Sequence, residues 1–172
     1  ATDCKLFRNS AEGKFTDISI SSGGCPAGFR GRGAAASDLD GDGLLDLLLG
    51  ESEFYGSPRR SRILRNVGEL KFTDVSEAAG LPADIPGMGV AAADLTGDGF
   101  PEIFLTGRDT GNRLFVNDGK GNFREAAGSA ETFAWKYSTG DDMPAGAAFG
   151  DVNRDGRLDL VVGQHFKRPW LE

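Results

Sequence analysis

The sequence contains no apolar run that approaches the roughly 18 residues needed to cross a bilayer as a helix. Its longest candidate, at positions 44–49, is interrupted by Asp46. The first three residues, Ala1-Thr2-Asp3, are polar and lack the apolar segment of a signal peptide. We therefore expect no membrane span, and we expect a mature, already processed chain.

Positive charge is also scarce. The 172 residues include 19 Lys and Arg against 26 Asp and Glu, which gives a net charge of −7 with the single histidine neutral. An acidic chain is poorly suited to nucleic acid or to an anionic membrane, and it is better suited to cations. Glycine is abundant instead, at 26 residues alongside 7 prolines, and this density of turn-forming residues favours many short strands over a helical fold.

Cysteine is limited to Cys4 and Cys25. Two cysteines 21 residues apart fit a single disulfide that closes a small loop, which would place the protein in an oxidising compartment. Two buried thiols in a cytosolic protein would give the same pattern. Of these two interpretations we favour the disulfide.

Two motifs recur three times in the same order. The first has the form Asp-x-Asp-x-Asp-Gly-x-x-Asp, and its copies begin 56 and then 57 residues apart, at Asp38, Asp94 and Asp151. A glycine stands five residues before each copy, at Gly33, Gly89 and Gly146. The second motif, a Leu shortly before an Asn and then a segment that begins with Phe, occupies residues 6–17, 64–74 and 114–125. Two independent motifs that keep one order indicate a repeat array.

Each repeat predicts four short strands, with the acidic loop between the first two, and this is the pattern of a β-propeller blade. We therefore expect an all-β fold of four-stranded antiparallel blades. The repeats divide the chain into the end of one blade at 5–30, blades at 31–86 and 87–143, and the first half of a further blade at 144–172. These make about three blades, fewer than the roughly 4 that a propeller needs to close. We expect the missing blades to come from a longer polypeptide or from other chains. The segment 75–81 also has the pattern of a short helix.

The acidic pattern contains the oxygen ligands of a calcium loop. Side chains at positions 1, 3, 5 and 9 and the backbone carbonyl at position 7 can surround a cation of the size of Ca²⁺, while the glycine at position 6 makes the sharp turn. Four carboxylates within nine residues would repel one another without a cation. We therefore expect up to three calcium ions. The ligand positions are Asp38, Asp40, Asp42, Leu44 and Asp46, then Asp94, Thr96, Asp98, Phe100 and Glu102, then Asp151, Asn153, Asp155, Arg157 and Asp159.

Other interpretations of these loops are weaker. An EF-hand requires a bidentate Glu at position 12 and flanking helices, whereas position 12 is Leu49, Leu105 or Val162 within β-like apolar runs. A metal-free Asp-Gly hairpin turn is common as a single copy, but three copies with acids at the same offsets disfavour it. Mg²⁺ fits less well than Ca²⁺ because it prefers fewer protein ligands.

The three loops differ in charge. The first has four carboxylates, the second has Thr96 at position 3, and the third has Asn153 at position 3 and contains Arg154 and Arg157. We expect calcium affinity to fall from the first loop to the third, with dissociation constants of about 10⁻⁴ to 10⁻³ M for the weaker sites.

The acidic loops, together with Leu6-Phe-Arg-Asn9 and Phe72-Thr-Asp-Val75, resemble the FG-GAP/VCBS repeat family, the calcium-binding propeller repeats of integrin α-subunits and many secreted proteins. The pairing of the two motifs is most similar to the cartilage-acidic-protein branch, although the ASPIC/UnbV segment of that branch is not evident. The resemblance covers nearly the whole chain. It implies a propeller with structural Ca²⁺ in hairpin loops, a secreted, extracellular, periplasmic or cell-surface location, and a role in adhesion or assembly.

Two pairs of glycines, in Gly31-Arg-Gly33 and Gly87-Met-Gly89, also resemble a dinucleotide fingerprint. Each leads directly into an acidic loop with no room for the helix that would support a phosphate. We interpret them as small residues that let strands pack closely near the propeller axis.

Two further segments are candidates for ligand binding. Residues 132–144 interrupt the repeat with aromatic and polar residues, which is typical of binding loops but also of a blade connection whose aromatics cap the core. The segment around the only histidine is better suited to an interface loop than to catalysis, because that histidine has no visible partner. The candidate residues are Trp135, Tyr137, Asp141, Asp142, His165 and Trp170.

The sequence thus predicts a calcium-binding extracellular β-propeller module for protein or glycan interaction, adhesion or assembly, without enzymatic activity. One alternative is part of a secreted carbohydrate-active enzyme whose catalytic residues lie in other blades. Another is a structural subunit of an extracellular filament or complex. No Ser-His-Asp or Cys-His arrangement is evident in the sequence.

Overall fold

In the computed structural model the described residues are 4–51, 60–107, 111–134 and 144–164. Their strands form four antiparallel sheets, so the predicted all-β fold class is confirmed. We call the sheets the first to fourth blades. In chain order they consist of β1 (Phe7–Asn9) and β2 (Phe15–Asp17); β3 (Gly31–Ser37), β4 (Asp46–Glu51), β5 (Arg62–Asn66) and β6 (Phe72–Asp74); β7 (Val90–Ala93), β8 (Glu102–Leu105), β9 (Arg113–Asn117) and β10 (Phe123–Glu125); and β11 (Pro144–Gly150) and β12 (Asp159–Gln164).

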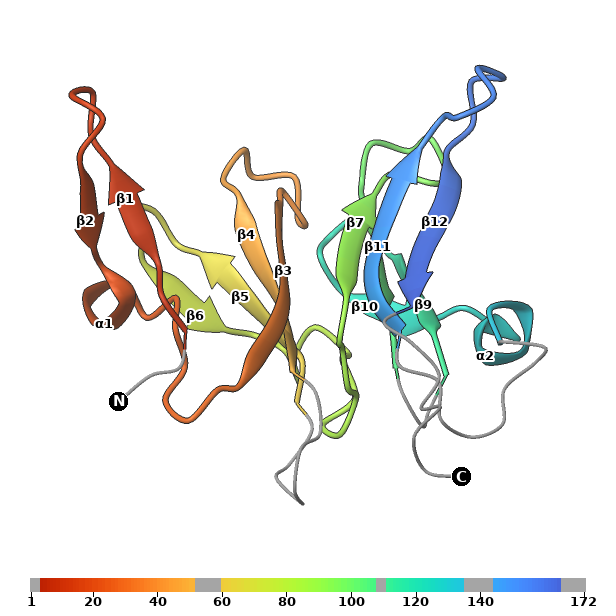
Figure 1. Ribbon diagram of the computed structural model, residues 1–172, viewed down its shortest axis with the longest axis horizontal. Helices are drawn as coiled ribbons and strands as arrows, with labels where there is room; N and C mark the ends of the chain where they lie inside the picture. Colours follow the sequence, from red (N-terminus) through yellow and green to blue (C-terminus); the bar gives the residue numbers. More distant parts are fainter. Residues whose placement is uncertain (1–3, 52–59, 108–110, 135–143, 165–172) are drawn as a thin grey trace.

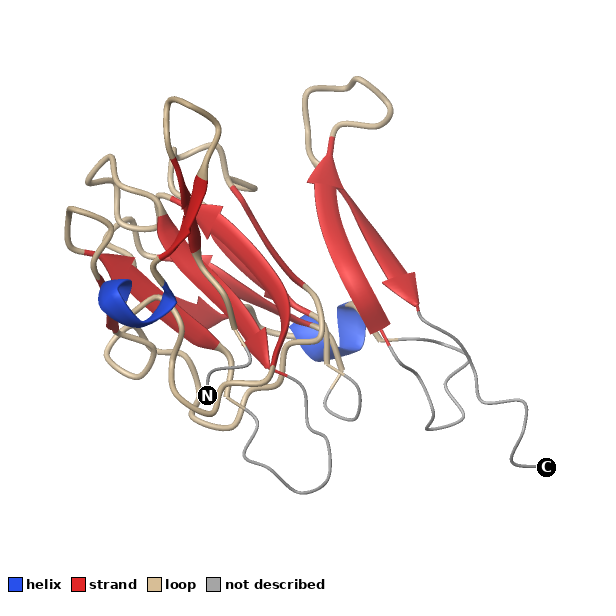
Figure 2. Cartoon of the chain, turned by 60° about the vertical axis from the view of Figure 1, so that its left-hand side comes forward, coloured by secondary structure: helices blue, strands red, loops and turns tan. Residues whose placement is uncertain are grey.

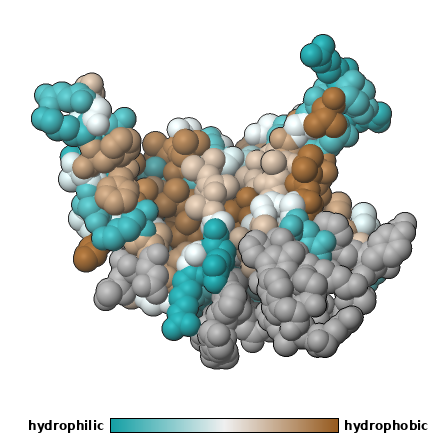
Figure 3. Space-filling model, viewed as in Figure 1, coloured by the Kyte–Doolittle hydropathy of each residue, from teal (hydrophilic) through white to brown (hydrophobic). Residues whose placement is uncertain are grey.

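The four blades stand side by side in a row (Figure 1). In the two complete blades every strand pairs with the next one along the chain. Neighbouring blades meet through their first strands, since β3 contacts β7 and β7 contacts β11. The β1–β2 and β11–β12 hairpins lie at opposite ends of the row, and Figure 2 shows β11–β12 standing apart from the other strands. On the face seen in Figure 3, apolar and neutral surface lies between the hydrophilic tips of these two hairpins.

Apolar side chains fill the spaces between the blades. β8 is buried along its whole length, and β4 nearly so. One cluster joins the second and third blades, and its most buried members include Leu48, Ile63, Ile103 and Phe115. A second cluster joins the first and second blades and consists of Phe29, Leu49 and Leu64, with Cys4, Leu47 and Phe72 packed against it. The first three blades are therefore stabilised by burial against one another.

The two helices, α1 (Ser19–Ser22) and α2 (Ser129–Thr132), follow β2 and β10. Segment 75–81, where the sequence allowed a short helix, forms a turn instead. One helix-type hydrogen bond forms there, from the Ala79 N–H to the Val75 carbonyl, before Gly80 enters the left-handed region with φ 85° and ends the turn. Both helices have four residues, so no helix in the described ranges could span a membrane.

The structure holds Cys4 and Cys25 as free thiols, so the disulfide expected from their spacing is not formed in it. The two side chains are nevertheless in contact. Burial, together with a hydrogen bond to Cys25, raises the pKa of Cys4 to about 12. Because the thiolate is the form that reacts, this environment keeps Cys4 in its thiol form at neutral pH. The spacing predicted which cysteines meet, but not their redox state in this structure.

Gly33 and Gly89 allow neighbouring blades to approach closely. A Cβ atom added at Gly89 would lie 2.0 Å from the carbonyl oxygen of Ala145 in the fourth blade, and one at Gly33 would lie 3.0 Å from the backbone nitrogen of Val90 in the third. The interpretation of these glycines as close-packing residues is therefore confirmed. The inner strands approach one another where a methyl group would collide with backbone.

Replacing Gly89 with alanine is expected to lower the free energy of unfolding by about 1–3 kcal/mol, because the methyl group overlaps the Ala145 carbonyl. Urea denaturation measures this change. Gly150→Ala is the matched control, since a Cβ there meets nothing within 4 Å and the equivalent residues of the complete blades are Ser37 and Ala93. Equal destabilisation of the two variants would contradict the close-approach argument.

A carboxylate holds the outer hairpin of each of the first three blades closed. The ion pairs are Lys5 with Asp17, Arg62 with Asp74 and Arg113 with Glu125. Asp74 also accepts hydrogen bonds from the N–H and hydroxyl of Ser76. Burial alone would raise the pKa of Asp74, but these hydrogen bonds and the Arg62 guanidinium outweigh it, and the pKa is lowered.

The ionised Asp74 is expected to stabilise the fold in a pH-dependent way. Its folded-state pKa lies below the unfolded value of about 3.9, so its contribution is complete above that pH and is lost as the pH falls through the folded-state pKa. The stability difference between the wild type and Asp74→Asn should therefore shrink between about pH 6 and pH 2. Urea titrations across this range test it, with Asp84→Asn, at an exposed loop position, as the control for loss of one charge. A difference that grows on acidification would rule out the assigned role.

Candidate metal centre

The first acidic loop, between β3 and β4, gathers three carboxylates. One oxygen atom from each of Asp38, Asp40 and Asp42 lies within 4.8 Å of the other two. Two oxygens bound to the same Ca²⁺ ion are separated by at most twice the metal–oxygen distance, about 4.6–5.2 Å. The three carboxylates are therefore spaced as ligands of a single calcium ion. Across the described ranges, no second group of three or more acidic, His or Cys side chains has this spacing.

The backbone of the loop holds this arrangement. Asp38 accepts hydrogen bonds from the N–H groups of Gly41 (2.8 Å) and Gly43 (2.9 Å). Both glycines have positive φ, 78° and 85°, a region that glycine adopts without strain. The chain thereby turns back over Asp38 and brings the next two aspartates beside it.

The other two loops fold in the same way, and Figure 1 shows all three at one side of the row of blades. The first acid again accepts the N–H groups that turn back over it, from Gly97 and Gly99 to Asp94 and from Asp155 and Gly156 to Asp151. The residues at position 7, predicted as carbonyl ligands, each donate an N–H to the acid at position 5, and they are Leu44, Phe100 and Arg157. Hydrogen bonds led by that from Gly99 lower the pKa of Asp94.

The acid at position 9 turns inward and braces its loop. One carboxylate oxygen accepts the N–H of the residue at position 2, with Asp46 bound to Leu39 (3.1 Å), Glu102 to Leu95 (2.8 Å) and Asp159 to Val152 (3.0 Å). Asp46 is fully buried, and its other oxygen accepts the N–H of Asn66 in β5 (2.8 Å). Burial raises the pKa of Asp46, although the hydrogen bonds oppose the rise. The structure thus gives Asp46 a bracing contact and does not gather it with the other three acids.

Glu102 differs from Asp46 because one of its oxygens is left unpaired. The residue is 1% exposed, and Oε1 has no hydrogen-bond partner among the described residues. A buried carboxylate oxygen without a partner is costly, and a bound cation would satisfy it. In the second loop, where Thr96 replaces the acid at position 3, Glu102 therefore offers the oxygen most in need of a metal.

An arginine that sequence reasoning missed reaches the first loop from β5. Nη1 of Arg65 lies 2.6 Å from Asp40 Oδ2, and Nε lies 3.8 Å from Asp46 Oδ2. Nη2 donates to the carbonyl of Gly121 in the third blade (3.3 Å). The guanidinium therefore neutralises part of the acidic charge and links two blades.

The third loop carries its own compensating charge. Arg157 pairs with Asp155 at 3.1 Å, and this contact lowers the pKa of Asp155. Asn153 Oδ1 also accepts the Asp155 N–H (2.9 Å). One acid of this loop is therefore already partnered by a cation from the same loop.

Asn117 is a second residue that the sequence analysis did not connect with the loops. Its amide donates to the carbonyl of Leu39 in the first loop (2.9 Å), across the boundary between blades. It also donates to Pro101 (3.0 Å), just as Asn66 donates to Leu45 (3.1 Å). The recurrence of this asparagine after the first and second acidic loops, at Asn66 and Asn117, was the signal that could have revealed the contact.

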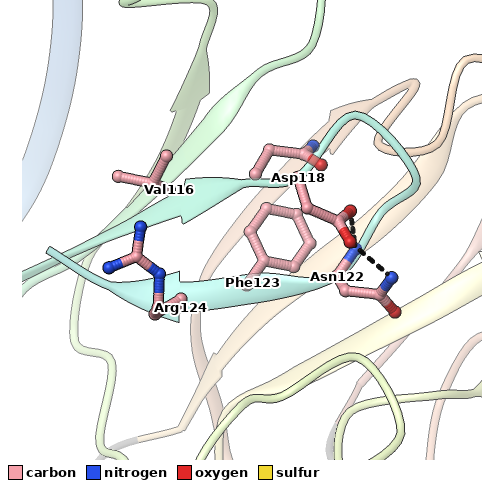
Figure 4. A pocket seen from close by; sticks show the side chains of 6 residues that line it. Val116, Asp118, Asn122, Phe123 and Arg124 are labelled. Atoms are coloured by element: carbon pink, nitrogen blue, oxygen red, sulfur yellow. Dashed lines mark hydrogen bonds between the residues drawn. The ribbon is translucent and has the colours of Figure 1, made fainter.

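The remaining candidates lie outside the described residues, and they are Trp135, Tyr137, Asp141, Asp142, His165 and Trp170. A hollow of about 280 Å³ on the third blade was not indicated by the sequence (Figure 4). In it, the Asp118 carboxylate accepts the N–H (3.1 Å) and side-chain amide (2.9 Å) of Asn122, and the amide contact is the main reason that the Asp118 pKa is lowered. This carboxylate is thus satisfied within its own turn.

The comparisons with known proteins agree on one family. The profile of the FG-GAP-like repeat matches residues 53–105 and 94–162. Cartilage acidic protein 1 of Xenopus tropicalis is 29% identical over 177 residues, covering 95% of this chain and 26% of that protein. The human and mouse proteins of the same name are 31% and 30% identical over 149 residues, covering 78% of this chain and 21% of each relative. The chain thus spans about a quarter of the length of these relatives.

Replacing Arg154 with glycine is expected to stabilise the third loop by about 0.5–1 kcal/mol. Arg154 has φ 65° at position 4, where the other loops have Gly41 and Gly97, both at φ 78°. Chemical denaturation in the presence of a chelator measures the gain. Arg154→Ala is the matched control because it removes the same charge but keeps a Cβ at positive φ. Equal stability of the two variants would show that charge, rather than backbone strain, limits this loop.

Proposed function

This chain belongs to the FG-GAP-like repeat family, and on that basis we propose that it is a calcium-binding segment of an extracellular β-propeller protein. Its role is to present blades for protein or glycan contact in adhesion or assembly, and not to catalyse a reaction. The observation that carries the proposal is the spacing of Asp38, Asp40 and Asp42, whose oxygens lie within 4.8 Å of one another. The ligand set consists of hard oxygens, which suits Ca²⁺.

The backbone of the first loop is suited to a calcium ion. The hydrogen bonds from Gly41 and Gly43 fix Asp38 before any ion binds, so less ordering is needed on binding. Arg65 pairs with Asp40, so a calcium ion would compete with this guanidinium for that carboxylate. A calcium ion bound here would supply positive charge and tie the start of the loop to its middle.

The second and third loops are proposed as weaker sites. The unpaired Oε1 of buried Glu102 supports a metal in the second loop. In the third, the Arg157–Asp155 ion pair competes with a metal for the same carboxylate. The affinity of a calcium loop depends on how many charged ligands it contributes, and this supports the order first, second, third.

An extracellular location is part of the proposal. The relatives carry the name cartilage acidic protein, and calcium loops of weak affinity suit an environment with millimolar calcium. A disulfide between Cys4 and Cys25 would fit such a location, because the two thiols already touch.

Isothermal titration calorimetry with Ca²⁺ tests the proposal. Asp42→Asn is the most informative variant: the Asp42 carboxylate accepts the Leu44 N–H through Oδ1, and an amide oxygen can keep that bond while the charge is lost. We expect it to weaken the tightest site at least about tenfold. Titration with Mg²⁺ should give weaker binding than Ca²⁺.

Asp118→Asn is the matched control, because it removes one carboxylate from an exposed turn outside the acidic loops. Its calcium affinity should equal that of the wild type. Loss of affinity in both variants would attribute binding to overall charge. Absence of calcium binding in the wild type would overturn the proposal.

A further inference from the structure

One side chain is hydrogen-bonded to the first and the second acidic loop at the same time. Asn117, the last residue of β9, donates one amide hydrogen to the carbonyl of Leu39 in the first loop (2.9 Å) and the other to Pro101 in the second (3.0 Å). Its Oδ1 accepts the N–H groups of Gly119 (3.0 Å) and Gly121 (3.2 Å). The residue is 5% exposed, and its amide group has no further hydrogen bond to offer. A single buried side chain therefore fixes the two loop backbones relative to each other.

The ring of Phe100 makes a second link between the loops. Phe100 is position 7 of the second loop, but a Cβ atom added at Gly41 of the first loop would lie 2.7 Å from its Cε1. A Cβ atom added at Gly119, in the turn between β9 and β10, would lie 3.4 Å from Cδ2 of the same ring. The ring therefore packs against the first loop at the residue that stands between Asp40 and Asp42.

The turn between β9 and β10 reaches the first loop at a third point. A Cβ atom added at Gly121 would lie 2.9 Å from the Cβ of Asp40, which is position 3 of the first loop. Gly119 and Gly121 both have positive φ, 78° and 73°, so this turn folds in a way that favours glycine. Each of the three successive residues 39–41 thus contacts the third blade.

These contacts require both loops to hold their present arrangement at once. Gly41 stands between two expected calcium ligands, Asp40 and Asp42, and Phe100 supplies the expected carbonyl ligand of the second loop. We propose that the first and second loops bind calcium cooperatively, each raising the affinity of the other through Asn117 and Phe100. The inference rests on the proposed calcium function. Binding in one loop orders contacts that the other loop shares, so less ordering remains for the second ion.

The test is a calcium titration followed by NMR, in which amide groups of each loop report its own occupancy. Gly41 and Gly43 report the first loop, and Gly97 and Gly99 report the second, since each N–H binds the first acid of its loop. The salt is about 0.15 M, which screens charges more than about 8 Å apart. Asp42→Asn, in the first loop, should move the second-loop midpoint to a calcium concentration at least about fivefold higher.

Phe100→Ala tests whether the ring carries the coupling. The substitution keeps the backbone carbonyl of position 7 and removes the ring from Gly41. In this background we expect Asp42→Asn to move the second-loop midpoint much less than it does when the ring is present. An equal displacement with and without the ring would assign the effect to charge, and the proposed coupling would be wrong.

A measurement without calcium tests the contact itself. In the presence of a chelator, Phe100→Ala should speed hydrogen exchange at the Gly41 N–H several-fold, because the first loop loses packing that holds it in place. Phe15→Ala is the matched control, since it removes the same ring from β2 of the first blade, where Phe15 is 68% exposed. Its Gly41 exchange should equal that of the wild type. Unchanged exchange in Phe100→Ala would contradict the link between the loops.

The outcomes distinguish this coupling from the calcium function on which it rests. If calcium shifts the amides of neither loop in the wild type, both proposals are wrong. If it shifts the amides of both loops, and Asp42→Asn leaves the second-loop midpoint unchanged, calcium binding stands and the coupling is overturned.

Discussion

The fold depends on carboxylates that accept backbone N–H groups of their own hairpin. The buried Asp46 is the clearest case, because its two oxygens bind Leu39 at the start of the acidic loop and Asn66 at the end of β5. One side chain thereby joins three strands of the second blade. An apolar residue there would leave both N–H groups without a partner in the interior, at a cost of about 1–3 kcal/mol each. The primary role of the acid at this position is therefore structural.

The acidic loops place negative charges close together, and backbone N–H groups and arginine side chains of the same chain compensate for them. In the first loop, N–H groups surround Asp38, and Arg65 faces Asp40 and Asp46. In the third loop, Arg157 takes up part of the charge of Asp155. Compensation by side chains of the same chain weakens the need for a metal. The first loop is nevertheless the strongest candidate for one, because its carboxylates lie closest together.

Sequence reasoning reached the order of the strands and the location of the loops because both follow from repetition. The acids recur at the same offsets, and Gly33 and Gly89 recur before them, so the same local backbone structure forms in each acidic loop. It did not reach contacts that join different blades, such as Arg65 to Gly121 or Asn117 to Leu39. Those contacts depend on how adjacent sheets are placed, which no periodicity encodes. The sequence also predicted a short helix at 75–81, where the structure forms a turn, because the positive φ of Gly80 ends the helical conformation.

The same dependence on neighbours explains why equivalent residues differ so much in burial. In an array of repeats each unit contacts only the units beside it, so stability is a sum of internal and interface terms. Leu48 and Val161 occupy the same position in their blades, yet only Leu48 is covered, because a blade follows it. The third acidic loop lies in the blade with no neighbour on its far side among the described residues. This loop also contains the positive φ of Arg154 and the Arg157–Asp155 ion pair.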